Sequence, residues 1–119
     1  MKATRVIIVD DEVLIVKAIS AILRLAGYDI VGVASTVADA LGLIGKHKID
    51  IAIIDANLRG ESAEPIFHRL AALNIDSLLI SGYATGQLSP ILTRFPFMNK
   101  PFDPASLLKI LEEIKLRRA

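Results

Sequence analysis

The sequence contains no cysteine, no tryptophan and almost no excess charge of either sign. The absence of cysteine excludes disulfide bonds and thiolate metal sites. The 14 Lys and Arg residues are balanced by 13 Asp and Glu residues, which does not indicate a surface for nucleic acid or an acidic membrane. The chain also lacks a signal peptide and a run of roughly 20 apolar residues, the length that a bilayer span requires. We therefore expect a soluble cytoplasmic protein that binds neither nucleic acid nor a membrane.

The length and the apolar content indicate one α/β domain over residues 1–119. A chain of 119 residues fits a single domain that buries its own core. Hydrophobic residues make up 53% of the chain, which fits strands that are covered on both faces. Five short aliphatic runs without polar alternation predict such strands. They span residues 5–9, 29–34, 49–55, 77–81 and 96–99.

Segments with apolar residues at helical spacing lie between most of these runs. They predict helices over residues 12–26, 36–46, 63–73 and 103–118. Gly27 ends the first helix, and Asp103 caps the last one with Pro104 in its first turn. The inward-facing residues of the first two helices are expected to be Ile15, Ala18, Ile19, Ile22, Leu23, Leu41 and Ile44.

Residues 85–94 fit a helix poorly because Pro90 lies inside the segment. If Ser89 caps a helix there, Pro90 falls in its first turn, and only a short helix can follow before Phe95. We therefore expect a short helix that starts late, preceded by a mobile loop over residues 83–89.

Strands and helices alternate along the whole chain, which predicts a parallel sheet with helices on both faces. The expected fold is α/β: a doubly wound five-stranded parallel sheet in the order 2-1-3-4-5, a three-layer sandwich of the flavodoxin type. Right-handed crossovers bring the carboxyl ends of all the strands to one edge. The first and third strands are then neighbours where the strand order reverses, and a crevice opens at that point.

Polar and charged residues stand at the ends of four predicted strands. Asp10 and Asp11 follow the first, Asp55 ends the third, Ser81 ends the fourth and Lys100 follows the fifth. Three carboxylates at one edge repel one another and raise the pKa of at least one of them, a conflict that a hard divalent cation such as Mg²⁺ relieves. A carboxylate beside Mg²⁺ and a lysine can accept a phosphoryl group, because both cations neutralise charge on that group. The pattern therefore predicts phosphoryl transfer to Asp55.

Taken together, the stretches VIIVDDE, IIDAN, LLISG and NKPFD resemble the CheY-like receiver domain of two-component response regulators. The resemblance covers the whole chain, in the order of the family. It implies a phosphorylation-dependent signalling switch, and not an enzyme, in which a sensor histidine kinase or a histidine phosphotransfer protein donates a phosphoryl group to Asp55. Mg²⁺, or Mn²⁺ in its place, assists the transfer. Phosphorylation then changes the surface around the fourth helix, the fifth strand and the fifth helix.

The resemblance also assigns roles to residues around the phosphoacceptor. Lys100 contacts the phosphoryl group, Ser81 supplies the switch hydroxyl and Phe97 is the switch aromatic residue. Asn57 and Tyr83 occupy positions that tune dephosphorylation. The implied metal ligands are Asp10, Asp11, Asp55 and the backbone carbonyl of Asn57.

Two further expectations concern the first helix and the loop before the last one. In related receivers the start of the first helix docks the phosphodonor protein, and we expect Val13 and Val16 to be exposed there. The Lys100–Pro101 bond is expected to be cis, which turns the chain toward the last helix and aims Lys100 at the crevice. The implied docking residues are Val13, Leu14, Ile15 and Ala18.

The sequence departs from the family pattern after Asp55, where the common proline before Gly60 is absent. The stretch SGYA resembles a subgroup of stand-alone receivers from bacterial stress signalling. We therefore expect a single-domain regulator that is a monomer or weak dimer, or alternatively a receiver fragment of a larger response regulator or hybrid kinase. The motifs identify neither the kinase nor the downstream target.

Two other classes of protein share parts of this pattern. Small aspartyl-phosphate hydrolases also use a strand-end Asp, but those of the haloacid dehalogenase type carry a general acid two residues later, where this chain has Asn57. A flavodoxin-like cofactor binder needs a phosphate-cradling loop rich in Gly, Ser or Thr after the first strand, where this chain has DDEV. The sequence therefore disfavours both classes.

Overall fold

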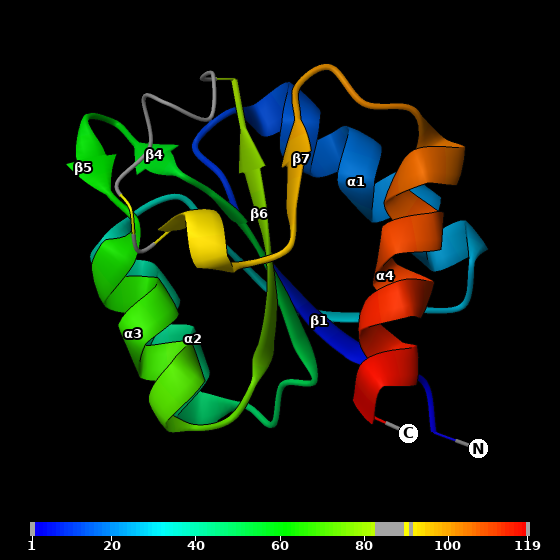
Figure 1. The fold of residues 1–119 in the computed structure, drawn as a ribbon, viewed down its shortest axis with the longest axis horizontal. Coiled ribbons are helices and arrows are strands. Elements are labelled where there is room, and N and C mark those ends of the chain that lie inside the picture. The colour runs from blue at the N-terminus through cyan, green and yellow to red at the C-terminus, as the bar shows by residue number, and fades with distance from the viewer. Residues whose placement is uncertain (1, 83–89, 91, 119) are drawn as a thin grey trace.

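The fold is a central sheet between two pairs of helices, seen in a computed structural model that describes residues 2–82, 90 and 92–118 (Figure 1). The first half of the chain contains β1 (Arg5–Val9), α1 (Val13–Leu25), β2 (Asp29–Ala34), α2 (Val37–Lys46), β3 (Ile51–Asp55), β4 (Asn57–Leu58) and β5 (Glu61–Ser62). The second half contains α3 (Glu64–Ala72), β6 (Asp76–Ser81), the 3₁₀ turn η2 (Leu92–Arg94), β7 (Phe97–Asn99) and α4 (Pro104–Arg118).

The main sheet has five strands in the order β2-β1-β3-β6-β7, and every neighbouring pair is parallel. This confirms the predicted fold and strand order. Its register aligns the ends of the central strands, because Val9 of β1 lies opposite Ile54 of β3, and Asp55 lies opposite Ile80 of β6. A second sheet, the antiparallel hairpin β4–β5, follows β3 directly and was not predicted from the sequence.

The sheet is covered on both faces, with α2 and α3 on one side and α1 and α4 on the other (Figure 1). Successive residues of β1 point to opposite sides: Ile7 and Val9 join the core cluster that includes Phe67 of α3, while Val6 and Ile8 join the cluster that includes Leu111 of α4. These four residues are fully buried. Burial on both faces explains why the strand lacks polar alternation.

Tyr28, just before β2, ties α4 to the rest of the fold at the sheet edge opposite the strand carboxyl ends. Its hydroxyl donates a hydrogen bond to Glu112 Oε1 at 3.1 Å. Lys115 Nζ lies 3.0 Å from the same carboxylate oxygen and 4.9 Å from the centre of the Tyr28 ring. The C-terminal half of α4 is therefore held to Tyr28 by a hydrogen bond and a cation–π contact, and the Glu112–Lys115 ion pair within the helix links the two contacts.

The helices agree with the predicted ranges to within one or two residues at each end, and their caps explain the boundaries. Thr36 Oγ1 accepts a hydrogen bond from Asp39 N at 3.1 Å and caps α2. Asp103 precedes α4 as predicted, and hydrogen bonds from the side chain and backbone of Ser106 lower the pKa of its carboxyl. Gly27 follows α1 with a φ of +88°, a backbone conformation that glycine adopts without strain.

Some predicted inward-facing residues are not inward. Leu41 was expected in the core but is exposed, because the buried side of α2 is formed by Val37, Ala40 and Ile44. Ala18 is exposed too, although Ile19 and Leu23 of the same helix are buried as predicted. A side chain at the margin of a helical stripe is buried only if a neighbouring element reaches it, which periodicity alone does not reveal.

Most of the poorly fitting segment 85–94, and the predicted mobile loop over residues 83–89, lie outside the described residues. The described part of the segment forms the 3₁₀ turn Leu92–Arg94, whose Leu92 is buried in the core. Among the residues that the structure describes, no helix combines the length and the apolar content that a membrane span requires.

Two glycines in different backbone conformations should respond in opposite ways to the same substitution. Gly27→Ala should lower the free energy of unfolding by about 1 kcal/mol, because a Cβ atom disfavours a φ of +88°. Gly42→Ala, within α2 and with no atom near its added Cβ, should raise it by up to about 1 kcal/mol. Urea unfolding of both variants measures the difference, and a Gly27→Ala variant as stable as Gly42→Ala would contradict it.

Candidate phosphoacceptor site

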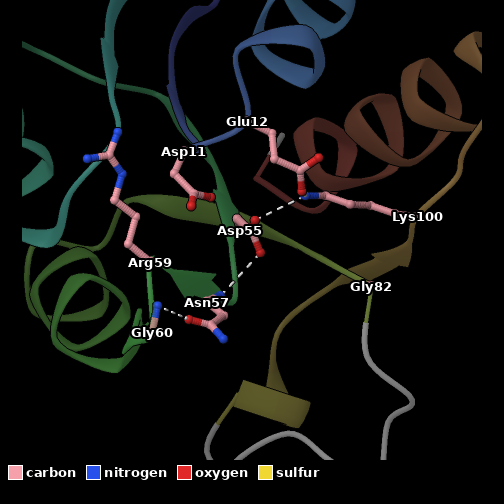
Figure 2. A pocket seen from close by; sticks show the side chains of 8 residues that line it. All are labelled: Asp11, Glu12, Asp55, Asn57, Arg59, Gly60, Gly82 and Lys100. Atoms are coloured by element: carbon pink, nitrogen blue, oxygen red, sulfur yellow. Dashed lines mark hydrogen bonds and ion pairs between the residues drawn. The ribbon is translucent and has the colours of Figure 1, made fainter.

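The carboxyl ends of β1 and β3 and the end of β7 form one wall of a cavity of about 350 Å³ (Figure 2). Parallel strands deliver these side chains together, because all of them end at the same edge of the sheet. The described residues that line the cavity are Asp11, Glu12, Asp55, Asn57, Arg59, Gly60, Gly82 and Lys100.

Three carboxylates meet at this edge, as the sequence predicts. Asp10, Asp11 and Asp55 each place an oxygen within 4.8 Å of the others. Asp10 and Asp55 are only 3% and 8% exposed, and Asp11 is half-buried. A compact set of carboxylate oxygens that opens onto a cavity suits a hard divalent cation such as Mg²⁺.

Lys100 forms ion pairs with two of these carboxylates and with a third one, that of Glu12. Its Nζ atom lies 3.1 Å from Asp10 Oδ2, 3.0 Å from Asp55 Oδ2 and 3.0 Å from Glu12 Oε1. The lysine follows β7, its backbone N donates to the Ser81 carbonyl at 2.8 Å, and the Lys100–Pro101 bond is cis as predicted. One ammonium group is therefore shared among three acids.

Glu12 is a member of the site to which sequence reasoning assigned no role. It lines the cavity and pairs with Lys100. Its backbone N also donates to Asp10 Oδ1 at 2.8 Å, which fixes the orientation of that carboxylate. The only sequence signal was its position directly after the two aspartates, and the distance to Lys100 depends on the folded chain.

Burial and neighbouring charges shift two pKa values in this cluster. Burial raises the pKa of the Asp10 carboxyl, and the negative charge of Asp55 adds to this rise; the Glu12 backbone N–H and Lys100 oppose it without cancelling it. Burial alone would lower the pKa of Lys100, but the hydrogen bonds that its ammonium donates to Glu12, Asp55 and Asp10 outweigh this effect. The pKa of Lys100 is therefore above its ordinary value, and the ammonium stays charged.

The loop after β3 orients Asp55. The backbone N of Asn57 donates to Asp55 Oδ1 at 3.2 Å, while Lys100 binds the other carboxylate oxygen. The Asn57 side chain turns the other way, and its Oδ1 accepts from Gly60 N at 2.9 Å (Figure 2). Both oxygens of Asp55 are thus held from opposite sides by the chain.

The predicted switch residues lie at the neighbouring strands. Ser81 is the fully buried last residue of β6, one position before Gly82 of the cavity wall. Phe97 is half-buried and packs against the core on the α2–α3 side; it does not line the cavity. Tyr83 lies outside the described residues.

The start of α1 presents apolar side chains next to the cavity. Val13 and Leu14 are 66% and 80% exposed and follow Glu12 directly. The prediction for Val13 is confirmed, whereas that for Val16 is wrong: Val16 is half-buried and, like Ile15, packs against the core cluster on the α1–α4 side. Of the four predicted docking residues, Val13, Leu14 and Ala18 are exposed and Ile15 is half-buried.

Comparison with known proteins agrees with the resemblance found in the sequence. The sequence model of the response regulator receiver domain matches residues 6–112. The chain is 31% identical to the uncharacterized transcriptional regulatory protein YbdJ of Bacillus subtilis, covering 91% of this chain and 49% of that protein. It thus spans about half the length of the curated relatives that it matches.

Solved structures agree with the sequence comparison. The solution structure of SdrG from Sphingomonas melonis Fr1 is 33% identical, has a TM-score of 0.85 and covers 96% of this chain and 98% of that one. A CheY-like receiver domain from Methanospirillum hungatei JF-1, 24% identical, shares the fold with a TM-score of 0.82 and a coverage of 98% of each chain.

Removing the shared ammonium group should destabilise the fold. Lys100→Met keeps an apolar stem but leaves Asp10 and Asp55 without their cation, so the free energy of unfolding should fall by about 1–3 kcal/mol at pH 7.5. Lys109→Met, an exposed position on α4, is the matched control and should change it by less than about 0.5 kcal/mol.

The pH dependence of this effect follows from the raised pKa of Lys100. The stabilisation is fully present below the pKa of an unfolded lysine, about 10.5, and is lost as the pH rises through the higher folded pKa. Urea unfolding should therefore give a constant difference between wild type and Lys100→Met from pH 7 to about pH 9, narrowing above about pH 10.5. A difference that widens at alkaline pH would exclude this role.

Proposed function

Because the chain belongs to the response regulator receiver domain family, we propose that it is a signalling switch that accepts a phosphoryl group on Asp55. The observation that carries the proposal is the Asp55 carboxylate, which lies 3.0 Å from Lys100 Nζ and within 4.8 Å of the Asp10 and Asp11 carboxylates in an open cavity. The donor is a sensor histidine kinase, a histidine phosphotransfer protein or a small acyl phosphate.

Asp10, Asp11, Asp55 and the backbone carbonyl of Asn57 are the groups that would hold Mg²⁺ in this site. When bound, the ion neutralises charge on the phosphoryl oxygens. The cluster of close carboxylates supports this assignment, because a divalent cation relieves their repulsion. Mn²⁺ has similar ligand preferences and should substitute.

The chain itself supplies the nucleophile and its orientation. The Asn57 backbone N and Lys100 Nζ hold the two Asp55 oxygens, so that one can attack phosphorus as its hydrogen bond is released. A new bond forms between this oxygen and phosphorus, and the bond from phosphorus to the donor breaks, so that its electron pair leaves with the histidine nitrogen or the acetate oxygen. Lys100, kept charged by its raised pKa, then pairs with the phosphoryl oxygens.

Ser81 and Phe97 are the proposed links from the phosphoryl group to the surface. Ser81 is buried at the end of β6, and its carbonyl accepts the hydrogen bond from Lys100 N. Movement of its hydroxyl toward Asp55 would change the packing beside β7, where Phe97 is only half-buried. The surface around η2, β7 and α4 is therefore the proposed output face for a downstream protein.

Asp55 should be the single site of phosphorylation, and the reaction should require a divalent cation. Incubation with acetyl phosphate and Mg²⁺ should add about 80 Da to the wild type and to the control Asp39→Asn on the exposed side of α2. Asp55→Asn, or wild type in excess EDTA, should gain no mass. Intact-mass spectrometry measures this, and equal labelling of Asp55→Asn would exclude the assignment.

The exposed start of α1 should be needed for transfer from a protein donor but not from a small molecule. Val13→Gln should slow phosphoryl transfer from an autophosphorylated cognate kinase about 10-fold or more, because a central apolar contact is lost. Labelling by acetyl phosphate should stay within about twofold. Leu25→Gln, at the other end of α1 and even more exposed to solvent, is the control and should behave as wild type in both assays. Equal losses with both donors would point to a folding defect instead.

A further inference from the structure

We propose that Arg59 binds the phosphoryl group of a small acyl phosphate at the mouth of the cavity and increases the rate of its transfer to Asp55. The inference rests on the proposed phosphoacceptor function. It gives a role in donor recognition to a residue that stands where the family commonly has proline. Three observations support it: the backbone of Arg59, the charges that line the cavity and the partners of Lys100.

Arg59 occupies a backbone conformation that does not suit it. Strands β4 and β5 pair Leu58 with Glu61, so the connection is a two-residue turn made of Arg59 and Gly60. Both turn residues have positive φ, 52° and 86°. Turns of this kind favour Asn, Asp or Gly at the first position, because a larger side chain is strained there. Asn-Gly would therefore make a more stable hairpin than Arg-Gly.

Contacts within the folded chain do not offset this strain. Arg59 is exposed, and no carboxylate among the described residues forms an ion pair with it. Its side chain lines the cavity, and Figure 2 shows the guanidinium group extending away from the Asp55 carboxylate. A strained residue beside a reactive group indicates a role in function rather than in stability.

The charges that line the cavity favour a role for Arg59 as a cation that binds the phosphoryl group. Asp11, Glu12 and Asp55 make its wall acidic, and Lys100 is the other cation among the described lining residues. Lys100 already pairs with three carboxylates, including Glu12 and Asp55, at 3.0 to 3.1 Å. The Mg²⁺ ion that these carboxylates would hold neutralises part of this charge, and an uncommitted cation at the entrance would attract a dianionic donor further. A guanidinium group can bind two phosphoryl oxygens at once.

The test compares labelling rates of the full chain with acetyl phosphate and Mg²⁺ at low salt, followed by intact mass. Arg59→Gln should lower the second-order rate about 3- to 10-fold, because it removes one positive charge near a dianion. Arg59→Lys should retain part of the rate, and 0.5 M NaCl should shrink the difference. Arg69→Gln, an exposed arginine of α3 that does not line the cavity, is the control and should leave the rate unchanged.

Three further measurements separate donor binding from a structural role. Phosphoramidate carries one negative charge fewer than acetyl phosphate, so Arg59→Gln should slow its transfer less. Arg59→Asn should lower the acetyl phosphate rate as Arg59→Gln does, yet raise the melting temperature by about 2 to 5 °C, because Asn-Gly suits the turn. Arg59 is not one of the proposed metal ligands. Added Mg²⁺ should therefore raise the melting temperature of each Arg59 variant at least as much as that of the wild type.

The outcomes distinguish donor binding by Arg59 from a purely structural role of Arg59 and from a failure of the proposed function. If Arg59→Gln is labelled at the wild-type rate, the inference is wrong while phosphorylation of Asp55 stands. A loss that is equal for both donors and insensitive to salt would assign Arg59 a structural role only, and would also overturn it. If the wild type itself gains no mass at Asp55, the proposed function fails, independently of Arg59.

Discussion

The contact of one lysine with three acids is the interaction on which the rest of the site depends. Asp10 and Asp55 are brought together by strands that are buried on both faces, so their carboxylates cannot move apart to relieve repulsion. Lys100 offsets that repulsion, and it can do so only because β7 adds to the sheet beside β6. The cavity, the orientation of Asp55 and the charge at its wall all follow from this arrangement. A divalent cation and a phosphoryl group would bind at a site whose carboxylates already surround one shared ammonium group.

The sequence predicts the five-stranded sheet because each strand is a short aliphatic run, and burial on both faces leaves that pattern intact. It also predicts the meeting of Asp10, Asp11, Asp55 and Lys100, because a parallel sheet collects strand ends at one edge. These predictions depend only on chain order and on the handedness of the crossovers. They do not require knowledge of how any side chain packs.

The features that the sequence did not predict depend on contacts between distant segments. The β4–β5 hairpin has strands of two residues, too short to show any periodicity. The role of Glu12 depends on a lysine that is distant in the sequence, and the burial of Val16 depends on its packing against the core on the α1–α4 side. Leu41 lies at the margin of the buried stripe of α2, where exposure is decided by the neighbouring elements.

The triad of Tyr28, Glu112 and Lys115 has a mechanical consequence for α4. The helix is fastened near its C-terminal end by this triad, and its N-terminal end follows Lys100 after a short connection. A displacement of Lys100 should therefore act first on the N-terminal end of α4, where Leu107 packs in the core, while Tyr28 holds the C-terminal half. We expect the helix to tilt about its contact with Tyr28, so that the largest displacement falls on its first turn, where Pro104, Ala105 and Ser106 are exposed, and the smallest falls near Glu112.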